Sequence, residues 1–267
     1  MDNKLSSMMK KALALMIVMT GMVSFAGLAH AITADGNMSD WGVTPSSWVS
    51  PPAGEHASFW EPSAGIQHVV EDQDPAIDQV IPGYGGQLFD AEAMYATFDN
   101  THFYFAIVTG HPSDGANNWR PGDIAFDFNS DGSYEYGIET TSHDGGFTLH
   151  GLFSVPDGGW KNSNLWGDPG PTEMNTVSGP ALTIADLVYN NSDYGEWSQG
   201  SHYVIEGSIL KSGFGSDWGK NFTMSWTQTC GNDVIKLNVN PVPEPASMAL
   251  FGIGLGGLAF LRRKQVK

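Results

Sequence analysis

Alternating hydrophobic and polar residues, separated by turn-forming residues, run through the chain from residue 89 to residue 239. The clearest run is Phe89–Phe98, whose period of two residues is typical of a β-strand. Its two expected faces are Ala91, Ala93, Tyr95 and Thr97 on one side and Glu92, Met94, Ala96 and Phe98 on the other. The turn Asp99–His102 and a second hydrophobic run, Phe103–Val108, follow at once. Two such runs around an Asp-Asn turn predict a β-hairpin.

Further strands are predicted at a similar spacing along the rest of the chain. They are Asp123–Phe128, Tyr134–Thr140, Phe147–Val155, Tyr203–Leu210, Phe222–Thr229 and Val234–Val239, with an opening edge strand and turn in Ile32–Trp41. Leu182–Tyr189 fits a strand or a short helix, Ser212–Trp218 one helical turn, and Gly158–Pro180 an irregular segment. Many short strands between turn signals predict an all-β fold, a single antiparallel β-sandwich with long loops over residues 32–240.

The N-terminal residues form a different pattern. Three lysines, Lys4, Lys10 and Lys11, precede an apolar run, Ala12–Ala29, and the run ends in Ala29-His30-Ala31. A basic segment, an apolar segment and an A-x-A site in this order are typical of a secretory signal peptide. We therefore expect residues 1–31 to be a signal helix that signal peptidase removes during export.

The C-terminal residues carry three features in a fixed order. Pro243, Glu244 and Pro245 precede an apolar run, 246–261, and Arg262, Arg263 and Lys264 follow it. An apolar run with a basic end predicts a transmembrane helix whose basic end stays in the cytoplasm. The three features together resemble the PEP-CTERM sorting signal of exported bacterial proteins. An ordinary C-terminal membrane anchor is the alternative.

The PEP-CTERM resemblance implies a partner and a destination for residues 241–267. An exosortase, a membrane protease, would recognise and cleave this tail. The chain would then be anchored transiently in the inner membrane and later be sorted to the cell surface or the extracellular matrix.

Charge is distributed unevenly between the ends and the body of the chain. Residues 32–245 hold 28 acidic and 5 basic residues, which leaves a net charge of −23. Such a charge repels nucleic acid and anionic lipid headgroups and favours divalent cations. A nucleic-acid partner is therefore excluded, and membrane contact is expected only through the tail. The single cysteine, Cys230, rules out an intrachain disulfide.

A candidate metal site follows the strand predicted at Asp123–Phe128. Oxygen-bearing side chains occur at alternate positions, and the expected ligands are Asp127, Asn129, Asp131, Ser133 (through its carbonyl) and Glu135. Gly132 occupies the sixth position, as in a Ca²⁺ loop, but Ile138 stands where a bidentate Glu would complete an EF-hand. We expect Ca²⁺ as cofactor here. An acidic hairpin turn is the alternative, because Asp, Asn and Gly are ordinary turn residues.

Aromatic residues in Gly- and Asn-rich loops suggest a second kind of site. Trp119, Trp160, Trp166 and Trp197 lie in such loops, whereas Trp41, Trp218 and Trp226 adjoin predicted strands or turns and are expected in the core. Exposed indole rings stack on sugar rings, so the four loop tryptophans are candidate ligand-binding residues for extracellular polysaccharide. The alternative is that they close the ends of the sandwich.

The body also resembles a known group of secreted sandwiches. The pattern consists of Asp35-Gly36, Asp40-Trp41, 91–108, 122–128 and 203–209, and it is similar to carbohydrate-binding-module-family-9 and DOMON-like domains. This resemblance implies a non-catalytic glycan-binding sandwich. Neither an H-E-x-x-H nor a G-x-S-x-G motif is present, and Cys230 has no assigned base, so no enzyme activity is expected. The alternatives are a structural or adhesive matrix protein and a glycan-active enzyme.

Overall fold

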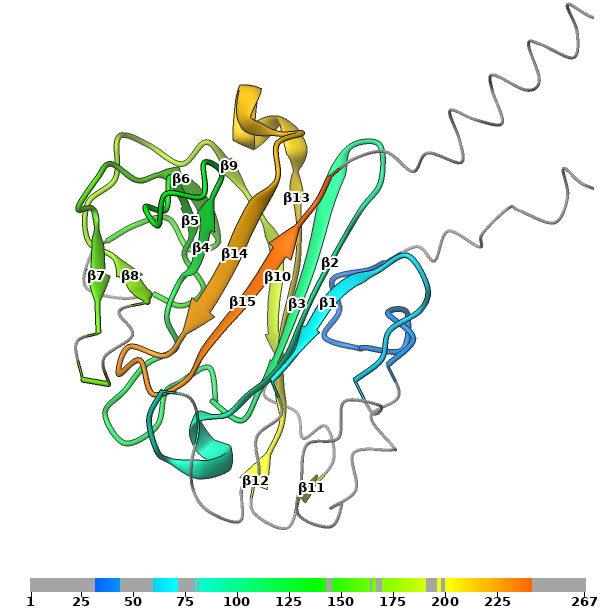
Figure 1. Ribbon diagram of the computed structural model, residues 1–267, viewed down its shortest axis with the longest axis vertical. Helices are drawn as coiled ribbons and strands as arrows, with labels where there is room; N and C mark the ends of the chain where they lie inside the picture. The colour runs from blue at the N-terminus through cyan, green and yellow to red at the C-terminus, as the bar shows by residue number, and fades with distance from the viewer. Residues whose placement is uncertain are drawn as a thin grey trace, which may run out of the picture. The chain divides into compact units, whose positions relative to one another are not determined.

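The computed structural model describes residues 32–43, 60–71, 80, 82–142, 146–163, 165–166, 170–190, 196–197 and 200–241. These residues form an antiparallel β-sandwich, which confirms the predicted fold class (Figure 1). The expected signal helix and transmembrane helix lie outside the described residues. Within the described ranges, no helix has the length and apolar character needed to cross a membrane.

Two sheets make up the sandwich. The five-stranded sheet has the order β1-β2-β3-β13-β10, and these strands are Gln67–Val70, Ala91–Phe98, His102–Thr109, Tyr203–Leu210 and Asp186–Asn190. The six-stranded sheet has the order β15-β14-β4-β5-β6-β9, and these strands are Val234–Val239, Phe222–Thr227, Ile124–Asp127, Tyr136–Ile138, Gly151–Ser154 and Thr183–Ile184. Every strand pair in both sheets is antiparallel.

Smaller elements lie around the two sheets. They are the hairpin β7 (Trp160–Asn162) and β8 (Pro171–Met174), the pair β11 (Glu196–Trp197) and β12 (Gly200–Ser201), and the 3₁₀ helices η4 (Gly86–Phe89) and η5 (Lys211–Asp217). The structure thus confirms the predicted β2–β3 hairpin and the helical turn near residue 212. The prediction of an irregular 158–180 segment was wrong for β7 and β8, because main-chain pairing formed these strands among Gly, Asn and Pro residues.

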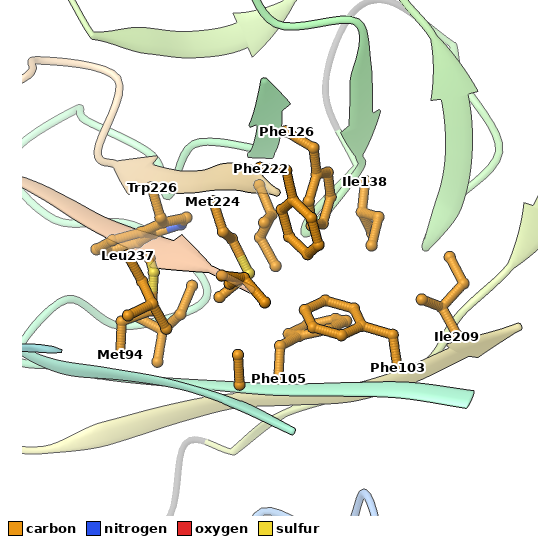
Figure 2. Close-up of a cluster of buried hydrophobic side chains, with 14 of the residues drawn as sticks. Met94, Phe103, Phe105, Phe126, Ile138, Ile209, Phe222, Met224, Trp226 and Leu237 are labelled. Carbon is orange, nitrogen blue, oxygen red and sulfur yellow. The ribbon is translucent and has the colours of Figure 1, made fainter. Parts of the chain in front are cut away.

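The core lies between the two sheets and is rich in aromatic side chains. Phe103 and Phe105 extend from β3, and Phe126, Phe222 and Trp226 face them from the other sheet (Figure 2). All five side chains are almost completely buried. Their ring centroids lie about 5.5–6.2 Å apart where they contact, as in the Phe103–Phe222 and Phe103–Phe126 pairs, which are edge-to-face. Burial of Trp226 agrees with its predicted place in the core.

The two sheets are linked to each other on both lateral sides of the sandwich. On one side the chain passes from β9 in the six-stranded sheet directly to β10 in the five-stranded sheet, with buried Ala185 between them. On the other side the Gln67 amide donates to the Asn240 carbonyl at 3.1 Å and accepts from the Asn240 N–H at 2.7 Å. This amide therefore joins β1 to the end of β15.

The outer face of the five-stranded sheet is covered by residues 32–43 and 60–66. The predicted edge strand in Ile32–Trp41 was wrong, because these residues form turns instead. Glu206 on β13 explains the difference, since its carboxylate accepts the N–H groups of Asp35 and Gly36 that a strand would need for pairing. Trp41 packs against Tyr95 with ring centroids 6.0 Å apart and is fully buried, as predicted.

Strand β2 contains a β-bulge that changes its expected faces. The register shifts between Ala91 and Ala93, and Ala91 joins Met94 and Ala96 in the core instead of sharing the face of Tyr95. Glu92 is buried, with its carboxylate 3.2 Å from His202 Nε2. A bulge adds one residue to a strand and so reverses the faces of the residues on one side of it. The faces predicted from residue 93 onward are therefore correct, and those predicted for the residues before Ala93 are reversed.

Candidate functional site

The connection between β4 and β5 folds around the side chain of Asp127. Its Oδ1 accepts the N–H groups of Asn129 at 3.1 Å and Ser130 at 2.6 Å, and its Oδ2 accepts the N–H of Gly132 at 3.0 Å. Gly132 has φ of +84°, a conformation that suits glycine. The loop therefore wraps its main-chain donors around one buried carboxylate.

Two further side chains repeat the same turn chemistry. Asn129 Oδ1 accepts the N–H of Asp131 at 2.9 Å, and Asp131 Oδ1 accepts the N–H of Ser133 at 2.7 Å. Asp and Asn side chains that bond the main chain two residues on form Asx turns. This alternation explains how residues spaced by two positions come to share one loop.

Three carboxylates converge in this loop. Oxygen atoms of Asp127, Asp131 and Glu135 lie within 4.8 Å of one another. Glu135 Oε2 accepts the N–H of Phe128 at 2.7 Å, while Glu135 Oε1 is buried and has no hydrogen-bond partner within the described part. Burial, together with the nearby charges of Asp127 and Asp131, raises the pKa of Glu135. A cation placed among these oxygens would offset the repulsion between the carboxylates and would provide a partner for the buried Glu135 Oε1.

The structure thus groups three of the five predicted metal ligands. Asn129 and Ser133 belong to the same loop, where the Asn129 side-chain oxygen already accepts a main-chain N–H. Carboxylate oxygens are the ligands that Ca²⁺ prefers, and Ca²⁺ takes six to eight of them. Three carboxylates leave several coordination positions for main-chain carbonyls, water or a ligand. Calcium binding itself stays a prediction.

A groove opens directly beside this loop. Its volume is about 260 Å³, and its lining comes from the metal loop, the turn after β6 and the β7–β8 hairpin. The lining residues are Gly132, Ser133, Tyr134, Glu135, Val155, Pro156, Asp157, Gly158, Trp160, Asn162 and Pro171. The lining therefore includes two aromatic residues, Trp160 and Tyr134, two acidic residues, Glu135 and Asp157, and one amide residue, Asn162.

Trp160 reaches this groove because the β7–β8 hairpin crosses the six-stranded sheet at Gly137. A Cβ at Gly137 would lie 2.7 Å from the Trp160 ring and 2.5 Å from Met174 Sδ, so only glycine leaves room for the hairpin. The Trp160 Nε1–H donates to the Tyr134 carbonyl at 2.8 Å, and the two rings are 6.3 Å apart. The hairpin and the metal loop are thereby joined.

The other predicted tryptophans lie elsewhere. Trp166 donates through Nε1 to Asn232 Oδ1 at 2.6 Å and packs edge-on against Tyr84, with ring centroids 5.8 Å apart. Trp119 is also partly exposed and precedes Arg120, whose main chain pairs with Thr229. Both therefore adjoin the β14–β15 turn, at the end of the sandwich opposite the metal loop. The side chain of Trp197 lies outside the described residues.

Sequence reasoning did not identify Tyr134, Asp157 and Asn162 as groove residues. Tyr134 stands directly before the predicted ligand Glu135, and this adjacency is the signal that could have identified it. Asp157 and Asn162 carry no such signal, because they reach the groove only through the packing of the β7–β8 hairpin on the sheet.

Two groups with strongly shifted pKa values lie away from the groove. Burial raises the pKa of the Cys230 thiol to about 11, which keeps it protonated and unsuited to nucleophilic attack. Burial also raises the pKa of Glu206 to about 7. Its two oxygens already accept three hydrogen bonds from Trp41, Asp35 and Gly36. Glu206 therefore has a structural place in the fold.

Comparison with known proteins bears on the tail. Residues 241–264 match the PEP-CTERM protein-sorting motif, and this range includes Pro243, Glu244, Pro245, Arg262, Arg263 and Lys264. No curated protein and no solved structure matches the chain significantly. The likeness of the body to carbohydrate-binding-module-family-9 and DOMON-like sandwiches therefore stays a prediction. The PEP-CTERM tail indicates that the chain is an exported protein, which an exosortase processes and which is anchored transiently in the membrane before its release.

Proposed function

We propose that the exported chain is a non-catalytic sandwich that binds extracellular glycan in the groove beside Asp127–Glu135, with the help of Ca²⁺. One observation carries this proposal: the groove is lined by Trp160 and by Glu135, and Glu135 belongs to the only cluster of three carboxylates within the described residues. An aromatic ring with nearby carboxylates and amides suits a sugar, which offers one apolar face and a rim of hydroxyl groups.

In this proposal the cation and the ring have separate tasks. Ca²⁺ neutralises Asp127, Asp131 and Glu135, and sugar hydroxyl groups complete its oxygen coordination in place of water. The sugar ring packs on Trp160, which the hydrogen bond to Tyr134 holds in place. Asn162 and Asp157 line the same groove and suit hydrogen bonds to further hydroxyl groups. Sorting by the tail brings this groove to the cell surface or the matrix.

A thermal melt tests the metal. The chain without its signal and sorting segments should show a higher midpoint in millimolar Ca²⁺ than in EDTA, because a ligand of the folded state stabilises it. Asp131→Asn should abolish the shift, and Asp114→Asn, which removes an exposed charge outside the loop, should leave it unchanged. Equal midpoints in Ca²⁺ and EDTA for the unaltered chain would contradict the metal.

Binding to insoluble polysaccharides tests the glycan. We expect the chain to sediment with a polysaccharide in Ca²⁺, and Trp160→Ala to lose this binding. Trp119→Ala is the matched control, because Trp119 does not line the groove and precedes Arg120, which is bonded to Thr229 near the β14–β15 turn. Equal loss in both variants, or release of reducing ends by the unaltered chain, would contradict a non-catalytic site at Trp160.

A structural or adhesive role is the second candidate. It is favoured by the Tyr84–Trp166 pair, whose side chains are 56% and 38% exposed at the β14–β15 end. Exposed apolar rings of this kind serve protein contacts as well as packing. Ca²⁺ stabilisation without binding to any polysaccharide would favour this role.

A further inference from the structure

The sorting tail leaves the sandwich at a fixed point. Strand β15 ends at Val239, the Gln67 amide holds both main-chain groups of Asn240, and Pro241 is buried. The PEP-CTERM motif begins at this same Pro241. The folded part of the chain therefore extends to the first residue of the motif.

Only a short tether separates this point from the apolar run that anchors the chain. Residues 242–245 connect Pro241 to Ala246, and two of these four residues are prolines. Five Cα–Cα steps span at most about 17 Å in an extended chain. The headgroup layer on one side of a bilayer takes roughly 5–8 Å of this length. The surface around Pro241 is consequently held within about 10 Å of the headgroups.

Strand register shows what lies around this exit point. Thr223 pairs with Asn238 near the end of β15 and also with Asp127, where the metal loop begins. Gln67 pairs with Ala96, close to the β2–β3 turn. Figure 1 shows this turn and η5 at the same end as the C-terminal end of β15, with the β14–β15 turn at the other end. We call the first end the tail end and the second the far end.

We propose that the tail end, formed by the β2–β3 turn, the metal loop and residues 210–221, is the surface that faces and contacts the phospholipid bilayer in the anchored precursor. The tether length and the Gln67–Asn240 clamp carry this inference, so it does not depend on Ca²⁺ or glycan. Its side chains suit an interface: Leu210 is 44% exposed, and Lys211 and Lys220 supply two of the five basic residues of the body. Leu210 and the lysine stems suit the boundary between headgroups and acyl chains.

The charges of this end set which lipids fit best. Lys220 is paired with Asp217, and Lys211 donates to the main-chain carbonyl of Asp99. The remaining negative charge lies in the metal loop, at Asp127, Asp131 and Glu135, and in the β2–β3 turn, at the carboxylate of Asp99. A zwitterionic bilayer therefore avoids the repulsion that anionic headgroups would add, and it is the probe for the test.

The test uses the full chain after signal removal, reconstituted through its tail into phosphatidylcholine vesicles with a nitroxide on some headgroups. In a Cys230→Ala background, a fluorophore is attached at Asn221→Cys on the tail end or at Asp114→Cys on the far end; both positions are exposed. We expect the Asn221 label to be quenched several-fold more strongly than the Asp114 label. A 20-residue Gly-Ser insertion after Pro241 lengthens the tether and should reduce this difference.

Two results would overturn the proposal. One is equal quenching of both labels with the native tether, or stronger quenching at Asp114. The other is crosslinking between copies at Asn221→Cys without quenching, which would assign the tail end to a second copy of the chain. Circular dichroism of each labelled variant confirms that the compared chains are folded.

Discussion

The indole N–H of Trp41 donates a 2.7 Å hydrogen bond to Glu206, a carboxylate fully buried on the outer face of the five-stranded sheet. The second carboxylate oxygen accepts the N–H groups of Asp35 at 3.1 Å and Gly36 at 2.6 Å. One side chain on β13 thus holds a segment that lies about 170 residues earlier in the sequence. The outer layer of the sandwich depends on this contact.

Stability should depend on pH through Glu206. Burial raises its pKa from 4.5 to about 7 in the folded state. Between these two pH values the native state binds more protons than the unfolded state, so the free energy of unfolding decreases as pH rises. The stabilisation by Glu206 is therefore fully present below pH 4.5 and is lost as pH rises through 7. A shift of this size corresponds to roughly 3 kcal/mol. The midpoint of urea denaturation should therefore decrease as pH is raised from 4.5 to 8.

Glu206→Gln is the control for this pH dependence. Glutamine cannot titrate, so the stability of the variant should lose the decrease with pH that Glu206 causes. The amide of glutamine also offers one acceptor oxygen fewer than the carboxylate. Burial lowers the pKa values of His111 and His150, and these groups add stability as pH rises. The difference between the unaltered chain and the variant isolates Glu206. A difference that does not change with pH would contradict the shifted pKa.

The aromatic core should be sensitive to truncation at Phe126. This ring extends from β4 in the six-stranded sheet and is completely buried. It contacts the rings of Phe103, Phe214 and Phe222. Phe126→Ala should lower the free energy of unfolding by about 3–5 kcal/mol, because it leaves a cavity. Phe147→Ala should lower this free energy clearly less, because Phe147 is only half-buried and packs against a smaller buried cluster. Urea denaturation of both variants checks the order, and equal losses would contradict it.

Glu173 should give the opposite pH dependence from Glu206. Its side chain is 5% exposed and pairs with Arg120 and with Lys161, whose Nζ is 3.1 Å from Oε2. Although burial acts to raise the pKa of Glu173, the hydrogen bonds and charges of these two cations outweigh it and lower the pKa. The stabilisation is therefore present above the usual carboxyl range and is lost as pH falls.

Glu173→Gln tests this ion-pair cluster. We expect a loss of about 2 kcal/mol at neutral pH, since both charge-assisted bonds weaken in a partly desolvated site. The loss should shrink in acid, where the native carboxylate is protonated. Glu61→Gln is the control, because Glu61 is 67% exposed and its contact with His68 is 3.7 Å. An equal effect of both variants on the urea midpoint would contradict the assignment.

The Cys230 thiol should be unreactive in the folded chain. It is buried with Val80 and Phe89, and burial raises its pKa to about 11. Thiol reagents act on the thiolate, so labelling at pH 8 should be very slow in buffer and fast in urea. Fast labelling of the folded chain, measured with a chromogenic disulfide reagent, would contradict the burial of this residue.

Local alternation predicts most strands of the fold correctly, and it fails where distant parts of the chain decide. The β2–β3 hairpin follows from hydrophobic residues around an Asp-Asn turn. The faces of β2 before residue 93 were predicted wrongly, because a bulge is set by pairing with Thr109 and Val108. Residues 32–41 were predicted to include a strand, but Glu206 takes their main-chain donors. Sequence spacing contains neither interaction.

The candidate site divides in the same way. The metal loop could be predicted because Asp127, Asp131 and Glu135 are close in sequence and Asx turns bring them together. The prediction that all four tryptophans lie in loops was wrong for Trp160 and Trp197, which belong to the short strands β7 and β11, and the grouping of the four could not be predicted. Gly137 admits the β7–β8 hairpin and with it Trp160, whereas the Asn232 contact draws Trp166 to the far end.

The Gln67–Asn240 clamp should control how firmly the end of β15 is held. Gln67→Ala removes two hydrogen bonds to Asn240, of 3.1 and 2.7 Å. The free energy of local opening at Asn240 should therefore decrease by about 1–2 kcal/mol. Because a loss of about 1.4 kcal/mol is tenfold in an equilibrium constant, amide hydrogen exchange at Asn240 should accelerate about tenfold. Gln67→Glu keeps the acceptor for the Asn240 N–H and loses the donor, so its effect should be smaller. Exchange at Met224, buried in β14, should stay the same in both variants. Unchanged exchange at Asn240 in Gln67→Ala would show that packing of Pro241 alone fixes the point where the tail begins.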